Sequence, residues 1–236
     1  MADPIVVSHL VKKYKDVTAV NDLSFTVASG RITGFLGPNG AGKSTTLRCL
    51  LALAKPTSGN VTLFGAPYEK LADPLTRVGV VLDTKGFSPG LSANDNLKVS
   101  ALAAGISLSR IPEVLEQVEI SHAAKRAVKG FSLGMKQRLS LAGALLGKPE
   151  VLILDEPANG LDPQGVSWLR QFLRGLASEG TTVLVSSHQL AEMQNTVDDV
   201  VIINHGSLVV SGEMSGIIGT GTLEEAFLKL TSGGVA

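Results

Sequence analysis

Residues 37–44 read Gly-Pro-Asn-Gly-Ala-Gly-Lys-Ser and fit the phosphate-binding pattern G-x-x-x-x-G-K-[S/T]. In such a loop the glycines let the backbone approach phosphate oxygens, Lys43 reaches the β- and γ-phosphates, and the Ser44 hydroxyl is a hard ligand for Mg²⁺. The alternative is a glycine-rich turn with an exposed lysine, which would require all these residues to coincide by accident. The loop therefore predicts a nucleoside triphosphate site. The residues expected to contact the nucleotide here are Gly37, Pro38, Asn39, Gly40, Ala41, Gly42, Lys43, Ser44 and Thr45.

The segments on either side of this loop support the same interpretation. Residues 31–36 predict a strand and residues 45–53 predict a helix. A helix that starts directly after the loop points its free N–H groups and the positive end of its dipole at bound phosphate. The pattern thus occurs in the strand–loop–helix context in which it is specific.

A second polar group follows the apolar run at residues 151–154. A buried strand there would deliver Asp155 to Mg²⁺, directly or through water, and Glu156 to the water that attacks the γ-phosphate. Acidic residues at a strand end are also common as solvated caps. That alternative is weaker here because a phosphate loop lies upstream in the same chain.

His188 follows a predicted strand at residues 181–185, which places it at the carboxyl edge of a sheet, where open α/β folds bind ligands. It is expected to hydrogen-bond the γ-phosphate or to orient Glu156, and we therefore group it with Glu156 and Lys43 as catalytic. A lone histidine after a strand is more often a surface or cap residue, so the prediction depends on the other motifs.

The composition excludes several classes of protein. Lys plus Arg and Asp plus Glu number 21 each, so the net charge gives no basic footprint for nucleic acid, and we expect no nucleic-acid partner. Cys49 is the single cysteine, which excludes an intrachain disulfide and fits a cytoplasmic protein. The first residues do not resemble a secretory signal, and no segment reaches the ~18 apolar residues that span a bilayer. Any work at a membrane is expected to go through a partner, without direct insertion.

The order of predicted elements indicates an α/β fold. Strand-rich residues up to about 83 are followed by helix-length segments, and strands alternating with helices then resume, which favours a largely parallel sheet. We expect one domain over residues 1–236, with a core at 1–83 and 148–212, a helical subdomain at about 84–147 and a tail at 213–236. The predicted strands are 5–7, 23–27, 31–36, 61–64, 78–82, 151–154, 181–185, 200–203 and 208–210, the last two as a hairpin. The predicted helices are 45–53, 94–104, 111–118, 132–146, 163–178 and 223–230.

Six motifs in order resemble the ATP-binding subunit of an ABC transporter over nearly the whole chain. Residues 37–44 resemble its Walker A motif, 151–156 its Walker B motif, 131–138 its signature motif and 159–162 its D-loop. His188 resembles the switch histidine, and Tyr14 the aromatic residue that stacks on adenine. The resemblance implies a P-loop NTPase (RecA-like) core with an N-terminal antiparallel β region and a helical subdomain insertion, binding ATP and Mg²⁺.

In this family two subunits sandwich two ATP molecules head to tail. The resemblance implies that Ser132, Gly134 and Asp162 contact the nucleotide of the opposite subunit. Ser132 and Asp162 are also expected as helix N-caps, and both roles can hold at once. The chain departs from the usual signature, Leu-Ser-Gly-Gly-Gln, at Leu133 and Met135, and it has Asp83 where the family usually has the Q-loop glutamine, so that Asp83 is a further expected Mg²⁺ ligand.

The form Ser-Leu-Gly-Met-Lys-Gln-Arg resembles subunits of drug- and antibiotic-resistance exporters. It implies an ATPase on the inner face of the cell membrane, held there by a separate transmembrane permease subunit that docks near residues 83–97. The complete set of motifs implies that the chain pairs as a homodimer. The chain is also expected to lack the longer C-terminal extension of many such subunits. One alternative is a soluble ABC-type ATPase that is not coupled to transport, and another is a nucleotide-binding regulatory module without turnover.

Overall fold

The structure is a computed structural model that describes residues 3–82 and 86–232. The chain divides into two compact units, one formed by Met1–Ala72 with Phe172–Ala236 and the other by Asp73–Gln171. Asp83 lies outside the described residues.

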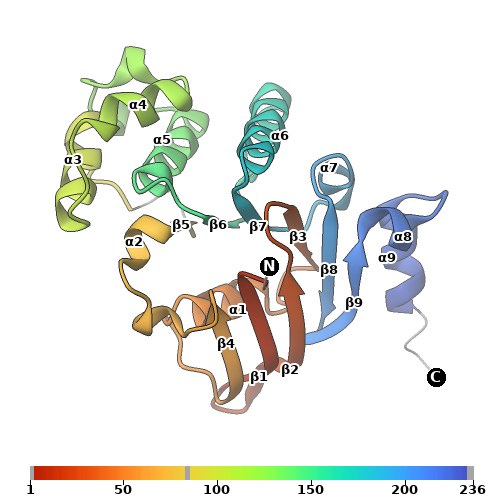
Figure 1. The fold of residues 1–236 in the computed structure, drawn as a ribbon. Helices are drawn as coiled ribbons and strands as arrows, with labels where there is room; N and C mark the ends of the chain where they lie inside the picture. The colour runs from red at the N-terminus through yellow and green to blue at the C-terminus, as the bar shows by residue number, and fades with distance from the viewer. Residues whose placement is uncertain (1–2, 83–85, 233–236) are drawn as a thin grey trace. The chain divides into compact units, whose positions relative to one another are not determined.

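The first unit contains an antiparallel sheet in the order β2-β1-β4, with β1 at Ile5–Tyr14, β2 at Val17–Val27 and β4 at Ser58–Leu63 (Figure 1). The predicted N-terminal antiparallel region is therefore confirmed. β1 is longer than the predicted strand at 5–7 because it continues through a bulge. His9 has φ 48° there, and the pairing with β2 shifts between Val7 and Leu10. The bulge interrupts the alternation of apolar side chains by which a strand is predicted.

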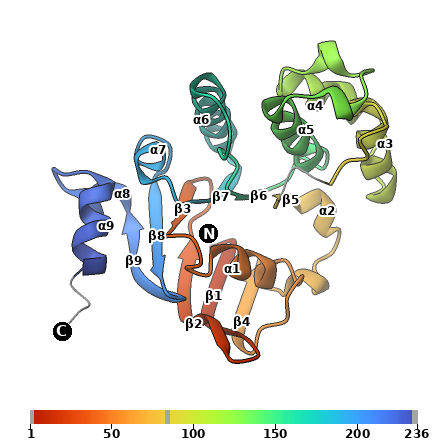
Figure 2. The ribbon, with the colours of Figure 1, turned by 180° about the vertical axis from the view of Figure 1, so that it is seen from behind.

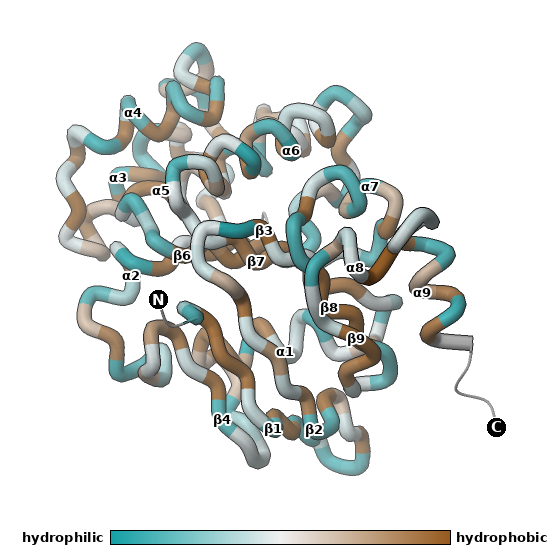
Figure 3. Tube along the Cα trace, turned by 45° about the vertical axis from the view of Figure 1, so that its right-hand side comes forward, coloured by the Kyte–Doolittle hydropathy of each residue, from teal (hydrophilic) through white to brown (hydrophobic). Residues whose placement is uncertain are grey.

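The first unit also contains β3 (Ile32–Leu36), which pairs in parallel with both β7 (Thr182–Ser187) and β8 (Asp199–Asn204). β9 (Ser207–Glu213) runs antiparallel to β8 and confirms the predicted hairpin. Its two-residue turn, His205-Gly206, has φ 46° and 80°, the pair of positive values that a type I′ turn requires. The apolar stretch of β8 is buried and stands out in Figure 3 as a brown segment.

The helices of the first unit are mostly short. α1 (Lys43–Leu50) contacts β2 and β4, and Figure 2 shows it beside this sheet. α9 (Leu223–Ser232) confirms the predicted C-terminal helix. α7 (Leu190–Gln194) and α8 (Met214–Ile218) were not predicted, because five residues are too few to show a helical period. A 3₁₀ turn lies at Tyr68–Lys70.

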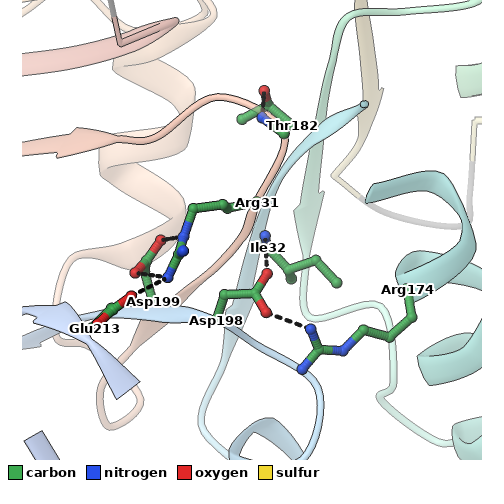
Figure 4. A network of polar contacts seen from close by, with 8 residues as sticks. Arg31, Ile32, Arg174, Thr182, Asp198, Asp199 and Glu213 are labelled. Atoms are coloured by element: carbon green, nitrogen blue, oxygen red, sulfur yellow. Dashed lines mark hydrogen bonds and ion pairs between the residues drawn. The ribbon is translucent and has the colours of Figure 1, made fainter. Parts of the chain in front are cut away.

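Two neighbouring aspartates anchor the strands of the first unit at the start of β3 (Figure 4). Asp199 accepts hydrogen bonds from Arg31 Nε and Nη2 at 2.6 and 2.8 Å, and Glu213 accepts a third at 3.1 Å. The hydrogen bond to Asp199 raises the pKa of the Arg31 guanidinium, against the opposing effect of burial. Asp198 accepts from the backbone N–H of Ile32 at 2.9 Å and pairs with Arg174. These bonds hold in place the N-terminal end of β3, the strand that leads into the phosphate loop.

The second unit combines two paired strands with helices. β5 (Val78–Val81) and β6 (Val151–Asp155) pair in parallel, and a short helix, α2 (Pro74–Arg77), precedes β5. The helices α3 (Ala93–Ala103), α4 (Arg110–Gln117) and α5 (Leu133–Leu145) confirm the three helices predicted in this region. α5 contacts α3, α4 and β5. Two 3₁₀ turns lie at Ser121–Ala123 and Val128–Gly130, and α6 (Pro163–Ser178) begins in this unit.

Across the ranges 3–82 and 86–232, the longest apolar helix falls short of what a membrane span requires.

Candidate nucleotide site

The phosphate loop joins β3 to α1 in the first unit. Gly42 caps α1 in a left-handed conformation, with φ 105°, and Gly40 has φ 81°. A Cβ atom on Gly42 would lie 2.6 Å from the carbonyl oxygen of Ala19, and one on Gly37 would lie 2.4 Å from that of Ile203. Glycine is therefore required at 42 by both conformation and space, and at 37 by the close approach of the next chain segment.

Lys43 is the first residue of α1 and is only 6% exposed. Its Nζ donates hydrogen bonds to the carbonyl oxygens of Gly37 at 2.7 Å and Pro38 at 3.3 Å, so that the side chain folds back across the loop that it ends. Ser44 beside it is exposed at the N-terminus of the helix. An ammonium group at the N-terminus of a helix is suited to phosphate, because the free N–H groups of the first turn and the positive charge both attract an anion.

The loop is held from outside by backbone bonds that the sequence did not indicate. The N–H of Gly206 donates to the carbonyl of Ala41 at 3.0 Å, and the N–H of Asn21 donates to that of Gly206 at 2.8 Å. Gly206 was visible in the sequence only as part of a turn. Its contact with the loop depends on the fold that brings the β8–β9 turn and β2 to the same place.

His188 follows β7 directly and is half-buried. In the parallel pairing of β3 with β7, Leu36 lies opposite Ser187. The phosphate loop and His188 therefore leave the sheet at the same carboxyl edge, as the sequence predicted.

Tyr14 is the last residue of β1 and is 46% exposed, with the Nζ of Lys12 lying 4.6 Å from the centre of its ring. Lys12 covers one face of the ring, and stacking on a flat ligand would use the other face.

The acidic pair lies at the end of β6 in the second unit. The side chains of Asp155 and Glu156 are half-buried, and Glu156 has φ 50°, a left-handed value that is uncommon for a residue with a side chain. The turn continues with the N–H of Asn159 donating to the carbonyl of Glu156 at 3.1 Å. The left-handed residue turns the chain sharply at the end of β6, directly after Asp155.

Two further predicted site residues of the second unit, Ser132 and Asp162, cap the N-termini of helices. Ser132 Oγ accepts from the N–H of Met135 at 3.2 Å at the start of α5, where Gly134 lies in the first turn. Asp162 Oδ1 accepts from the N–H of Gly165 at 2.7 Å at the start of α6. Both residues are exposed, and both predicted N-caps are confirmed.

A β-strand, a glycine-rich loop that encloses a lysine and a helix that begins at that lysine define a P-loop nucleoside triphosphatase. A model of the family described as ABC transporter matches residues 20–159. The chain belongs to the ABC transporter family. It is an ATP-binding cassette, with the α/β P-loop fold and the ATPase activity by which these cassettes drive transport.

Individual relatives agree with this assignment. The bacitracin transport ATP-binding protein BcrA of Bacillus licheniformis is 46% identical over 212 residues, which cover 89% of this chain and 69% of the relative. The lantibiotic transport ATP-binding protein SrtF of Streptococcus pyogenes is 38% identical over 221 residues and 94% of each chain. A solved ATP-binding subunit of an ABC transporter superposes with a TM-score of 0.86 at 27% identity, covering 96% of this chain and 99% of the other.

Proposed function

We propose that this chain hydrolyses ATP to drive export of antibiotics or similar amphipathic compounds, as a head-to-tail homodimer bound to a separate membrane-spanning permease. The observation that carries the ATPase part is the buried Lys43 at the start of α1, enclosed by the carbonyls of its own loop. The transported class is supported by the similarity to proteins named for bacitracin and lantibiotic transport. The permease would hold the chain at the inner face of the cell membrane.

The proposal gives each predicted site residue a role. The N-terminus of α1 and the backbone of residues 37–45 bind the β- and γ-phosphates, and Lys43 neutralises their charge. Tyr14 stacks on adenine. Glu156 accepts a proton from the attacking water, and His188 hydrogen-bonds the γ-phosphate or orients Glu156.

The hard oxygens present fit Mg²⁺. The Ser44 hydroxyl is exposed at the start of α1, and the Asp155 carboxylate is half-buried at the end of β6. Mg²⁺ is usually held by one or two such groups together with substrate phosphates and water, and it would supply charge neutralisation at the γ-phosphate. Asp83, which lies outside the described residues, is proposed as a further ligand at the Q-loop position.

In this proposal, residues at the N-termini of two helices in the second unit contact the ATP that is bound by the opposite subunit. Ser132 and Gly134 begin α5, and Asp162 begins α6, so each can present backbone N–H groups or an exposed side chain to a partner. We assign them to the ATP held by Lys43 of the other subunit. Residues 84–147, which carry α3 to α5, form the proposed helical subdomain on which the permease docks.

The test is steady-state phosphate release by the purified chain and by Glu156→Gln. The variant keeps the size and hydrogen bonding of the side chain but cannot take up the proton, so kcat should fall by about 10² or more while ATP affinity persists. Glu179→Gln, at an exposed position after α6, is the matched control and should retain wild-type turnover. Near wild-type turnover of Glu156→Gln would contradict the catalytic role.

The transport part is tested by co-producing this chain with a multi-span membrane protein chosen from the neighbouring reading frames. Vesicles that contain both proteins should accumulate a fluorescent amphipathic antibiotic only with ATP, and Glu156→Gln should abolish the uptake. Hydrolysis that is unchanged by the membrane protein, with no uptake, would instead indicate an ATPase that is not coupled to transport.

A further inference from the structure

We infer that Leu133 is a positioning residue that links the signature motif to the D-loop and thereby couples the two ATP sites of the dimer. This inference rests on the proposed function, in which Ser132 and Glu156 of one subunit serve different ATP molecules. Leu133 is the first residue of α5 and replaces the glycine that is usual in the family signature.

The contact is defined by the space beside Gly160. A Cβ atom built on Gly160 would lie 2.5 Å from Leu133 Cδ2, so the leucine side chain fills the space that any larger residue at 160 would need. Gly160 also has φ 73°, a conformation that favours glycine for a separate reason. The D-loop is thus shaped both by its own backbone and by the side chain packed on it.

The neighbouring residues extend this contact. A Cβ atom on Gly134 would lie 3.8 Å from Leu161 Cδ2, an ordinary packing distance. Further along the same two helices, the Arg138 guanidinium lies 3.7 Å from the centre of the Trp168 ring. Arg138 is itself held by the carbonyl of Val118 at 2.9 Å and by the Glu119 carboxylate at 2.7 Å. The start of α5 therefore contacts the residues just before α6, and the two helices contact each other again more than one turn further on.

A short path joins the Glu156 turn to the Ser132 cap through this contact. The carbonyl of Glu156 accepts from Asn159 N–H at 3.1 Å, and Gly160 follows Asn159 in the chain. Leu133 packs on Gly160 and directly follows Ser132. A movement of the Glu156 turn thus displaces the residue proposed to hold the phosphate of the opposite site. A glycine at position 133 has no side chain to pack on Gly160, so this path would be interrupted.

Because Leu133 is 44% exposed, its truncation should affect coupling more than folding. Leu133→Ala should leave ATP affinity and KM within about twofold of wild type, lower kcat at least threefold, and reduce the Hill coefficient for ATP toward one. Leu133→Met, which keeps the volume and reach, should restore both kcat and the Hill coefficient. A Leu133→Ala protein with wild-type kcat and Hill coefficient would overturn the inference.

A double-mutant cycle tests the contact itself. Gly160→Ala adds backbone strain in any background, but it meets the leucine side chain only when Leu133 is present. The factor by which Gly160→Ala lowers kcat should therefore be at least threefold smaller in the Leu133→Ala background than in the wild type. If the double variant loses kcat by the product of the two single-variant factors, the two residues are not coupled and the inference is overturned.

The same cycle separates failure of this inference from failure of the proposed function. If the wild-type chain does not hydrolyse ATP, the proposed function fails, and the cycle is then read from urea midpoints. The shift caused by Gly160→Ala should be smaller in the Leu133→Ala background, and equal shifts would show that the two residues do not interact.

Discussion

Leu36 of β3 lies opposite Ser187 of β7 in a parallel pair, so the chain leaves both strands at one edge of the sheet. The residue after Leu36 opens the phosphate loop, and the residue after Ser187 is His188. Two segments about 150 residues apart in sequence are thereby brought to one edge by backbone pairing alone. This register supports our proposal that His188 contacts the γ-phosphate of a nucleotide bound at Lys43.

Gly42 lies close to β2, so replacing it with alanine should destabilise the protein more than the same change at Gly40, which is also in the loop. Gly42→Ala brings a Cβ atom to 2.6 Å from the Ala19 carbonyl oxygen at φ 105°, whereas Gly40→Ala at φ 81° meets no atom within 4 Å. Gly40→Ala should cost about 1–2 kcal/mol through backbone strain, and Gly42→Ala should cost more because strain and collision add. Urea unfolding and ATP titration of both variants check this. Equal losses would show that β2 does not constrain the loop.

Asp198 should stabilise the fold by more than its ion pair with Arg174, because its carboxylate also accepts the N–H of Ile32. Asp198→Ala leaves the N–H of Ile32, a residue that is fully buried, without its acceptor and should lower the free energy of unfolding by about 1–3 kcal/mol. Asp198→Asn keeps an oxygen in place and should cost less. Arg174→Ala removes only a partly exposed pair and should cost about 1 kcal/mol or less. Chemical denaturation of the three variants should give this order, and an Arg174→Ala loss as large as that of Asp198→Ala would contradict it.

Cys49 should be unreactive in the native protein. Burial raises the pKa of its thiol above the usual value of 9.0, with a smaller opposing effect of Lys12, so the thiolate fraction at any given pH is lower than in the unfolded chain. A chromogenic disulfide reagent should label the native protein at least tenfold more slowly than the urea-unfolded protein at pH 7.5. The native rate should rise as the pH increases toward 9. Equal native and unfolded rates would show that the thiol is accessible and ionised.

The sequence was sufficient where chemistry and local pattern coincide. The loop at 37–44, the strand ending at Asp155 and the caps at Ser132 and Asp162 each depend on residues close together in the chain, and the structure confirms their local conformation. The extension of β1 beyond residue 7 was not predicted, because the bulge at His9 changes which face the following side chains occupy.

Other features depend on contacts between distant segments and had no sequence signal. The packing of Leu133 on Gly160 and the bond from Gly206 to Ala41 are examples. In the sequence, Leu133 is only a departure from the family signature. The glycine at 160 belonged to a recognised motif, but nothing in the chain indicated that the two residues touch.

The central claim is that two copies of this chain enclose ATP between Lys43 of one and Ser132 of the other. Its most direct test is size-exclusion chromatography of Glu156→Gln with ATP and Mg²⁺, alone and combined with Ser132→Arg. The single variant should elute as a dimer, and the combined variant as a monomer whose ATP affinity stays within about threefold, because the arginine conflicts only with the facing subunit. Glu156→Gln combined with Ser109→Arg, at an exposed position in the same unit, should still dimerise. A dimer peak that Ser132→Arg leaves unaltered would contradict the claim.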